Sequence, residues 1–188
     1  MKQFFKKIRL TFYIFEEIFF SFFLKTYNKF YKKWSWIPEN EFNFLSNNFN
    51  LDQIDKIVVI GSGAIPNTAL YFAQKKDNII IYAVERNYLA FFSSIILLHR
   101  LKIKNVKIIR NINYLYDYDN GLIIITLHTV LKQTILNKIL NRNNKNVIIV
   151  IRQPLNRFDH FERVFIDEIG CFKIRQSDIF ESIVIFVQ

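Results

Sequence analysis

From Lys56 onward, short apolar runs alternate with amphipathic stretches along the chain. The apolar runs are rich in β-branched residues, which is typical of buried strands. The stretches between them carry apolar residues every three or four positions and predict helices. The predicted strands cover residues 56–60, 78–84, 106–109, 121–127 and 147–151, and the predicted helices cover residues 66–75, 88–101, 130–141 and 158–169. This alternation predicts a parallel sheet with helices on both faces.

The last two predicted strands, residues 172–177 and 182–187, are joined only by Asp178-Ile-Phe-Glu181. A parallel crossover needs about a dozen residues, so these strands are predicted to pair as an antiparallel hairpin. The pattern therefore predicts an α/β fold with a doubly wound, Rossmann-like, mostly parallel seven-stranded sheet. An antiparallel C-terminal hairpin closes this sheet, and an N-terminal helical segment precedes it.

Residues 1–36 show a helical period. One apolar stripe contains Phe4, Ile8, Phe12, Phe15, Phe19, Phe23, Tyr27 and Phe30. The apolar run from Leu10 to Leu24 is shorter than the roughly 20 residues that span a bilayer, and Glu16 and Glu17 interrupt it. Two interpretations stay open: the segment packs on the main domain as a lid, or it lies on a membrane or a partner as a basic amphipathic helix.

Residues 37–55 contain Pro38 and an asparagine-rich run, and they predict a connector with one short helix. The predicted organisation is therefore an N-terminal helical segment over residues 1–55 and a Rossmann-like domain over residues 56–188.

Charge and cysteine content narrow the function classes. The formal net charge is +10, and residues 1–36 hold eight basic residues against two glutamates. This excess indicates an anionic partner such as RNA or a lipid surface, unless the lysines only solvate the surface. Cys171 is the single cysteine, so no internal disulfide forms and a cytoplasmic location is expected, with membrane association through residues 1–36 as the alternative. The histidine and cysteine spacing matches no zinc site.

The stretch from Lys56 to Pro66 carries the first chemical signal. The apolar run Ile57-Val-Val-Ile60 stops at Gly61-Ser62-Gly63, and two glycines so close together let the backbone turn tightly near a ligand. Glu85 follows Gly63 by 22 residues and ends the second predicted strand. An acid at this position can accept hydrogen bonds from both hydroxyls of a ribose. The alternative is a solvated carboxylate at a strand end.

These residues and the closing hairpin resemble the class I S-adenosylmethionine-dependent methyltransferases. The resemblance is carried by Ile57-Val-Val-Ile-Gly-Ser-Gly63, Ala83-Val-Glu85-Arg-Asn87 and Asn105-Val-Lys-Ile-Ile-Arg-Asn111, and it covers residues 56–188. It implies that Gly61 and Gly63 face the methionine part of S-adenosylmethionine and that Glu85 binds its ribose, with Ser62 between the two glycines as a further cofactor-binding residue. Asn111 and Asn113 would lie beside the adenine, where many members have an aspartate. Thr126, near the end of the fourth predicted strand, joins this predicted cofactor-binding set.

A narrower similarity points to the nicotianamine synthase family. Gly61-Ser-Gly-Ala-Ile-Pro66-Asn-Thr68-Ala is similar to the Gly-Ser-Gly-Pro-Leu-Pro-Leu-Thr-Ser of that family. Ile151-Arg-Gln-Pro-Leu-Asn-Arg157 is similar to its fifth-strand ending, which carries two arginines at the same separation. Those enzymes transfer the aminocarboxypropyl group of S-adenosylmethionine, and their N-terminal helical domain is larger than residues 1–55.

The ends of the fourth and fifth strands carry the candidates for the reacting side. His128 is the candidate general base for an amine or hydroxyl nucleophile, and the alternative is a polar residue that starts a helix. Arg152 and Arg157 are candidates for binding a substrate carboxylate or phosphate, and the alternative is a partner such as Asp159 or Glu162.

Together these features predict an S-adenosylmethionine-dependent transferase that methylates a small-molecule acceptor by direct displacement at the sulfonium, without a catalytic metal. Aminocarboxypropyl transfer is the first alternative. A non-catalytic membrane-surface or interaction protein with the same fold is the second. An RNA methyltransferase is less favoured, because the core lacks a basic patch interleaved with aromatic residues.

Overall fold

The computed structural model describes residues 27, 28, 31, 35–111, 119–142, 145–155, 162–166, 171–178 and 180–187. Of the predicted N-terminal stripe, Tyr27 lies within this part, and residues 27, 28 and 31 are helical. The rest of this stripe, together with Asn113 and Arg157, lies outside the described residues. The lid or surface role of the N-terminal segment and the domain boundary after residue 55 stay predictions.

From Trp36 onward, the described chain contains seven strands and four α-helices. The strands are β1 (Lys56–Ile60), β2 (Ile80–Val84), β3 (Val106–Ile109), β4 (Gly121–Ile125), β5 (Val147–Pro154), β6 (Cys171–Arg175) and β7 (Phe180–Val187). The helices are α3 (Trp36–Asn48), α4 (Asn67–Lys75), α5 (Tyr88–Leu101) and α6 (Lys132–Leu140), with a 3₁₀ turn at Leu51–Gln53.

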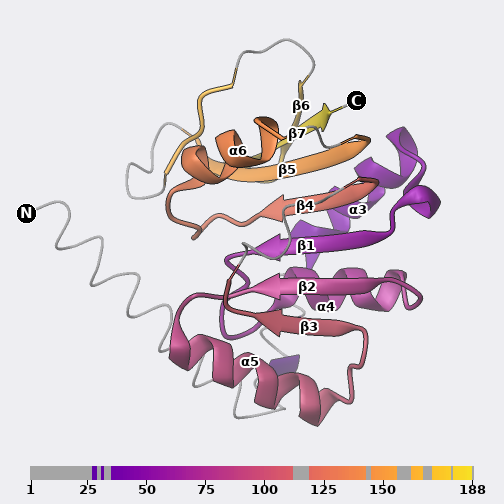
Figure 1. The fold of residues 1–188 in the computed structure, drawn as a ribbon, viewed down its shortest axis with the longest axis vertical. Coiled ribbons are helices and arrows are strands. Elements are labelled where there is room, and N and C mark those ends of the chain that lie inside the picture. Colours follow the sequence, from indigo (N-terminus) through magenta and orange to yellow (C-terminus); the bar gives the residue numbers. More distant parts are fainter. Residues whose placement is uncertain are drawn as a thin grey trace, which may run out of the picture.

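The strands form one sheet in the order β3-β2-β1-β4-β5-β7-β6. The first five strands are parallel, and β7 pairs antiparallel with both β5 and β6. Figure 1 shows α3 and α4 on the far side of this sheet, α6 on the near side, and α5 beside β3 at the lower edge. The predicted seven-stranded sheet and its closing hairpin are confirmed.

Alternating side chains of the strands supply two hydrophobic clusters, because successive residues of a strand point to opposite faces. On one face, Ile57 and Val59 of β1 join Leu45 of α3 and Phe72 of α4. On the other face, Val58 and Ile60 join Leu136 of α6. The central strands are therefore buried on both sides, which explains their uninterrupted apolar sequences.

The prediction of a connector with one short helix over residues 37–55 is wrong in extent. A 13-residue helix, α3, occupies most of this stretch. Pro38 is the third residue of α3, where a backbone N–H has no partner within the helix, so proline costs little there. The buried face of α3 contains Ile37, Glu41 and Leu45 and packs on α4 and the sheet.

The helix predicted over residues 158–169 is wrong where the structure describes it. Residues 162–166 have no regular secondary structure. Their backbone N–H groups donate to side chains instead of to carbonyls one turn earlier: Val164 N to Gln153 Oε1 at 3.3 Å and Phe165 N to Gln133 Oε1 at 2.8 Å. Glu162 in turn accepts from Gln133 N at the start of α6. Hydrogen bonds to side chains of distant residues have thus replaced the hydrogen bonds of the predicted helix.

In the described residues, no helix is both long and apolar enough to cross a membrane.

Candidate functional site

The register of the parallel strands brings most of the predicted site residues to one edge of the sheet. Ile109, Val84, Ile60, Ile125 and Ile151 lie side by side across β3, β2, β1, β4 and β5. The residues that directly follow this row are Arg110, Glu85, Gly61, Thr126 and Arg152. The first four directly follow the carboxyl ends of their strands, and Arg152 lies two residues before the end of β5. This edge is on the left in Figure 1, where open α/β sheets bind ligands.

The glycine loop after β1 turns as the sequence predicted. Gly61 has φ +76° and Gly63 has φ +72°, conformations that glycine adopts without steric cost. Gly61 N and Ser62 N both donate to Val84 O, at 3.0 and 3.2 Å. The loop therefore turns across the end of β2 before α4 begins at Asn67.

Two threonines after β4 support this loop from inside. Thr126 Oγ1 donates to Gly61 O at 2.7 Å, and Thr129 Oγ1 donates to Ile60 O at 2.8 Å. A Cβ on Gly61 would meet Thr129 Oγ1 and lie 2.9 Å from Thr126 Oγ1. Thr126, predicted as a cofactor contact, is thus a buried support of the glycine loop, and its direct contact with a cofactor stays a prediction.

Glu85 joins the two predicted cofactor-binding elements. Its Oε2 accepts from Gly63 N at 2.8 Å, and its Oε1 accepts from Asn87 N at 2.7 Å. An ionised carboxylate has about four acceptor positions, so two bonds leave acceptor capacity for further hydroxyl groups. The alternative of a merely solvated carboxylate does not describe this side chain.

Two buried polar atoms near the loop lack a hydrogen-bond partner within the described part of the chain. They are Ser62 Oγ and Asn67 Oδ1, one in the glycine loop and one at the first residue of α4. Buried polar groups are nearly always hydrogen-bonded, and an unpaired one costs free energy. Both atoms are therefore suited to receive a polar ligand.

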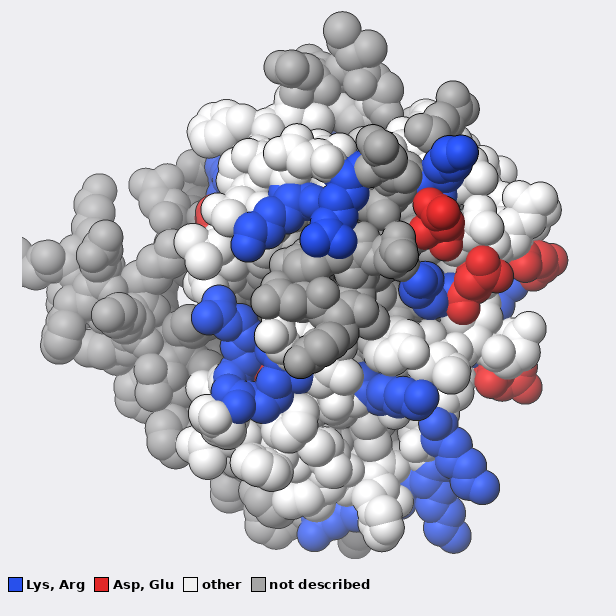
Figure 2. Space-filling model, viewed as in Figure 1, with Lys and Arg blue, Asp and Glu red and all other residues white. Residues whose placement is uncertain are grey.

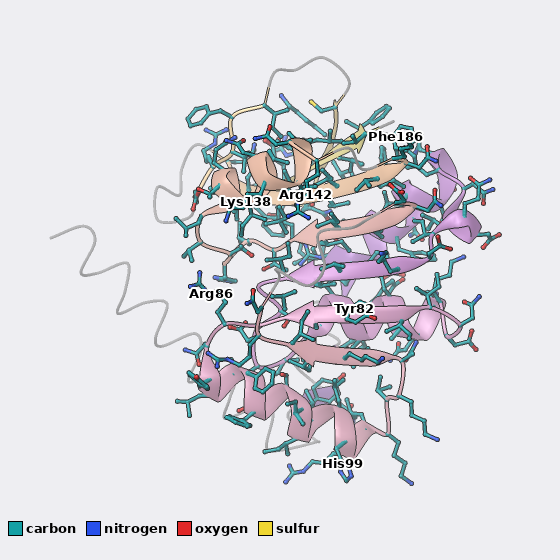
Figure 3. All side chains as sticks on the ribbon, in the orientation of Figure 1. Tyr82, Arg86, His99, Lys138, Arg142 and Phe186 are labelled. Carbon is teal, nitrogen blue, oxygen red and sulfur yellow. The ribbon has the colours of Figure 1, made fainter. Side chains whose placement is uncertain are left out.

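Two other predicted site residues have exposed side chains. Asn111 is exposed just after β3, and His128 is exposed in the turn after β4. His99, which is not among the predicted site residues, lies in the last turn of α5, far from the carboxyl edge (Figure 3). Among the described residues, no group of three histidine, cysteine or acidic side chains could hold a metal ion.

Arg152 has a partner that the sequence did not indicate. Its Nε donates to Glu41 Oε1 at 2.8 Å and its Nη2 to Glu41 Oε2 at 2.7 Å. Ser182 Oγ of β7 also donates to Glu41 Oε1, at 2.6 Å. Glu41 is fully buried, so this bidentate pair joins α3 to β5 and β7 inside the protein. The predicted substrate contact of Arg152 stays a prediction, while its position gives it a structural role.

Lys132 organises the loops on the reacting side of the edge. Its buried ammonium donates to Leu127 O at 2.8 Å, Arg152 O at 2.7 Å and Glu162 O at 3.3 Å. One side chain thus joins the turn that carries His128, the end of β5 and residues 162–166. In the sequence, Lys132 was simply one of several polar residues after the fourth strand.

Solved structures with this fold include enzymes that use S-adenosylmethionine. A point mutant of MtNAS, a nicotianamine synthase, matches with a TM-score of 0.65 and 15% identity over 87% of this chain. The same mutant in complex with S-adenosylmethionine matches with a TM-score of 0.66 and 14% identity over 93% of this chain. This chain spans 64% and 72% of the length of those two structures.

A precorrin-6y C5,15-methyltransferase from Geobacter metallireducens matches with a TM-score of 0.52 and 16% identity, over 73% of this chain and 84% of that one. No protein-family model and no curated protein matches the sequence. At these identities the likeness establishes the fold, which is that of S-adenosylmethionine-dependent methyltransferases and nicotianamine synthase. The resemblance found in the sequence is confirmed at that level.

Proposed function

We propose that this chain is an S-adenosylmethionine-dependent transferase that methylates a small-molecule acceptor. The observation that carries the proposal is the 2.8 Å bond between Gly63 N and Glu85 Oε2. It holds the glycine loop against the acidic end of β2, at the edge where this class of sheet binds ligands. The complex of MtNAS with S-adenosylmethionine, which shares the fold, supports the choice of cofactor.

The side chains at this edge fit the parts of the cofactor. Gly61 and Gly63 allow close approach of the methionine part. Ser62 Oγ and Asn67 Oδ1 are buried atoms that a polar amino-acid end would satisfy. Glu85 has acceptor capacity left for the ribose hydroxyls. The amides of Asn111 and Asn113 can pair with an adenine edge.

When bound, S-adenosylmethionine supplies an electrophilic carbon on a sulfonium that already carries its leaving group. The residues of the chain then have two tasks: to align the acceptor and to accept its proton. We assign to His128 the role of the base that accepts this proton, because it lies in the turn after β4, at the edge of the sheet where the cofactor would bind. Arg157 is the proposed contact for an acidic group of the acceptor. Lys132 fixes the backbone on which His128 is placed.

Aminocarboxypropyl transfer is the second candidate, and one observation favours it. The two MtNAS matches have TM-scores of 0.65 and 0.66, above the 0.52 of the precorrin methyltransferase, and they include the segment before β1. Product analysis separates the candidates. Methyl transfer releases S-adenosylhomocysteine, whereas aminocarboxypropyl transfer leaves methylthioadenosine.

Isothermal titration with S-adenosylhomocysteine tests cofactor binding. We expect the wild type to bind and Glu85→Ala to weaken binding about tenfold or more, the effect of one or two lost charge-assisted hydrogen bonds. Asp178→Ala is the matched control, because this exposed carboxylate pairs with Arg175 in the C-terminal hairpin. If the wild type does not bind S-adenosylhomocysteine at millimolar concentration, the proposal is wrong. Binding without turnover of any acceptor would favour the non-catalytic alternative.

A further inference from the structure

Helix α5 presents an unusually apolar surface to solvent. Its exposed apolar side chains, named here the α5 apolar face, are Tyr88, Leu89, Phe92, Ile95 and Ile96. Leu89, Phe92 and Ile96 are three and four residues apart, so they lie on the same side of the helix. Leu89 is 58% exposed and Phe92 is 56% exposed. Contiguous apolar surface of this kind marks an interaction site.

The distribution of side chains around the first half of α5 is the reverse of that in an ordinary surface helix. Ala90, Ser93 and Ser94 are buried against the protein, and Ser94 Oγ donates to Phe91 O at 2.7 Å. The larger apolar side chains point outward. Apolar side chains on the outer side of a helix gain favourable free energy only when a second apolar medium covers them.

Positive charge surrounds the α5 apolar face. Residues 85–111 contain six basic residues and one acidic residue. Arg86 lies just before α5 and Lys102 and Lys104 just after it, all exposed, and the Arg110 guanidinium lies 3.3 Å from the centre of the Tyr88 ring. Figure 3 shows Arg86 at one end of α5 and His99 near the other. In Figure 2, blue side chains lie on both sides of the pale surface in this region.

We propose that the α5 apolar face docks on an anionic lipid surface. Leucine, isoleucine and aromatic side chains would enter the boundary between headgroups and acyl chains, while the basic residues at both ends of α5 would face lipid phosphates and carboxylates. The positive charge around the α5 apolar face favours an anionic lipid surface over residues 1–26 of the same chain as its partner. That segment carries five basic residues against Glu16 and Glu17, so it would meet like charge at α5.

Vesicle co-sedimentation of the full chain tests the proposal. We expect binding to vesicles of phosphatidylcholine mixed with phosphatidylserine, weaker binding to phosphatidylcholine alone, and a loss of binding as salt is raised. The double variant Phe92→Ser/Ile96→Ser should bind about tenfold or more weakly, because it removes apolar area from the lipid contact. Lys102→Asn/Lys104→Gln should reduce binding only to the anionic vesicles.

Phe165→Ser is the matched control, since Phe165 is 86% exposed on a different segment and should leave vesicle binding unchanged. All variants should unfold at the wild-type temperature, because the replaced side chains are exposed.

Failure of the wild type to bind anionic vesicles overturns the proposal, and so does equal binding by Phe92→Ser/Ile96→Ser. A wild-type dimer that becomes monomeric in that variant would assign the face to a second copy. A marked fall of the unfolding temperature of Phe92→Ser/Ile96→Ser would show that another part of the same chain covers the α5 apolar face. S-adenosylhomocysteine binding is a separate readout, so failure here leaves the proposed transferase function intact.

Discussion

At the scale of single residues, Gly61 has no room for a side chain. Its φ of +76° disfavours every L-residue, and Thr126 and Thr129 occupy the volume of a Cβ. We expect Gly61→Ala to lower the free energy of unfolding by about 3 kcal/mol, as the sum of backbone strain and overpacking. Urea denaturation measures this change. A loss well below 1 kcal/mol would show that the threonines move aside easily.

Ser62→Ala is the control in the same loop, and it should not lower the free energy of unfolding. Ser62 Oγ is buried without a partner in the described chain, so removing it should keep or raise the unfolding free energy, by about 1 kcal/mol at most. If Ser62 contacts the cofactor, the same variant binds S-adenosylhomocysteine less tightly. Stability and binding would then change in opposite directions, as expected for a residue kept for function.

At the scale of elements, the Glu41–Arg152 pair joins α3 to the end of the sheet. Removing one partner leaves the other charge buried and unpaired, so Glu41→Gln should cost about 3–5 kcal/mol of unfolding free energy. Glu41→Gln/Arg152→Met removes both charges and should cost about 2 kcal/mol less than the sum of the single variants. A double-variant cycle by urea denaturation measures this coupling.

The pair Asp52–Lys76 is the control for that cycle, because its carboxylate lies at the surface. Asp52 is 87% exposed, and hydrogen bonding to Lys76 lowers the pKa of its carboxyl. Asp52→Asn should leave the unfolding midpoint in urea nearly unchanged at neutral pH, because solvent and salt screen the exposed Asp52 carboxylate. Strict additivity in the Glu41–Arg152 cycle would mean that α3 is held by its apolar face alone.

At the scale of the whole molecule, the local pattern of apolar residues was sufficient to predict the sheet. The apolar runs located all seven strands, and parallel pairing then placed Gly61, Glu85, Thr126 and Arg152 at one edge. Both results need only the period of the side chains and the rule that parallel strands end together. The hairpin followed from a connection too short for any other pairing.

The interactions across the molecule could not be derived in this way. Glu41 and Arg152 are 111 residues apart, and Lys132 donates to carbonyls of three separate segments. No periodicity marks such contacts, since they depend on the final packing. The helix predicted over residues 158–169 was wrong within residues 162–166 for the same reason, because Gln133 and Gln153 supply its hydrogen-bond acceptors from elsewhere.

Three tyrosines connect the start of the described chain to α4. Tyr27 is buried, its ring lies 5.7 Å from that of Tyr31, and Tyr31 Oη donates to Gln74 Oε1 at 3.1 Å. Burial, followed by the charge of Tyr31, holds the pKa of Tyr27 well above its usual range. Burial, followed by the charges of Tyr71 and Glu39, raises the pKa of Tyr31 to about 12.

These pKa values predict alkaline loss of stability. Above pH about 10 the unfolded chain loses tyrosine protons that the folded chain keeps, so the unfolding free energy falls as pH rises. For Tyr27 the slope reaches about 1.4 kcal/mol per pH unit. Tyr27→Phe has no proton to lose, and its unfolding free energy should fall less steeply over the same range. Urea denaturation between neutral pH and pH 12 compares the two proteins, with phenolate absorbance reporting ionisation. Equal slopes would show that Tyr27 is accessible to solvent and that the contact between residues 27–31 and α4 opens before the rest of the molecule.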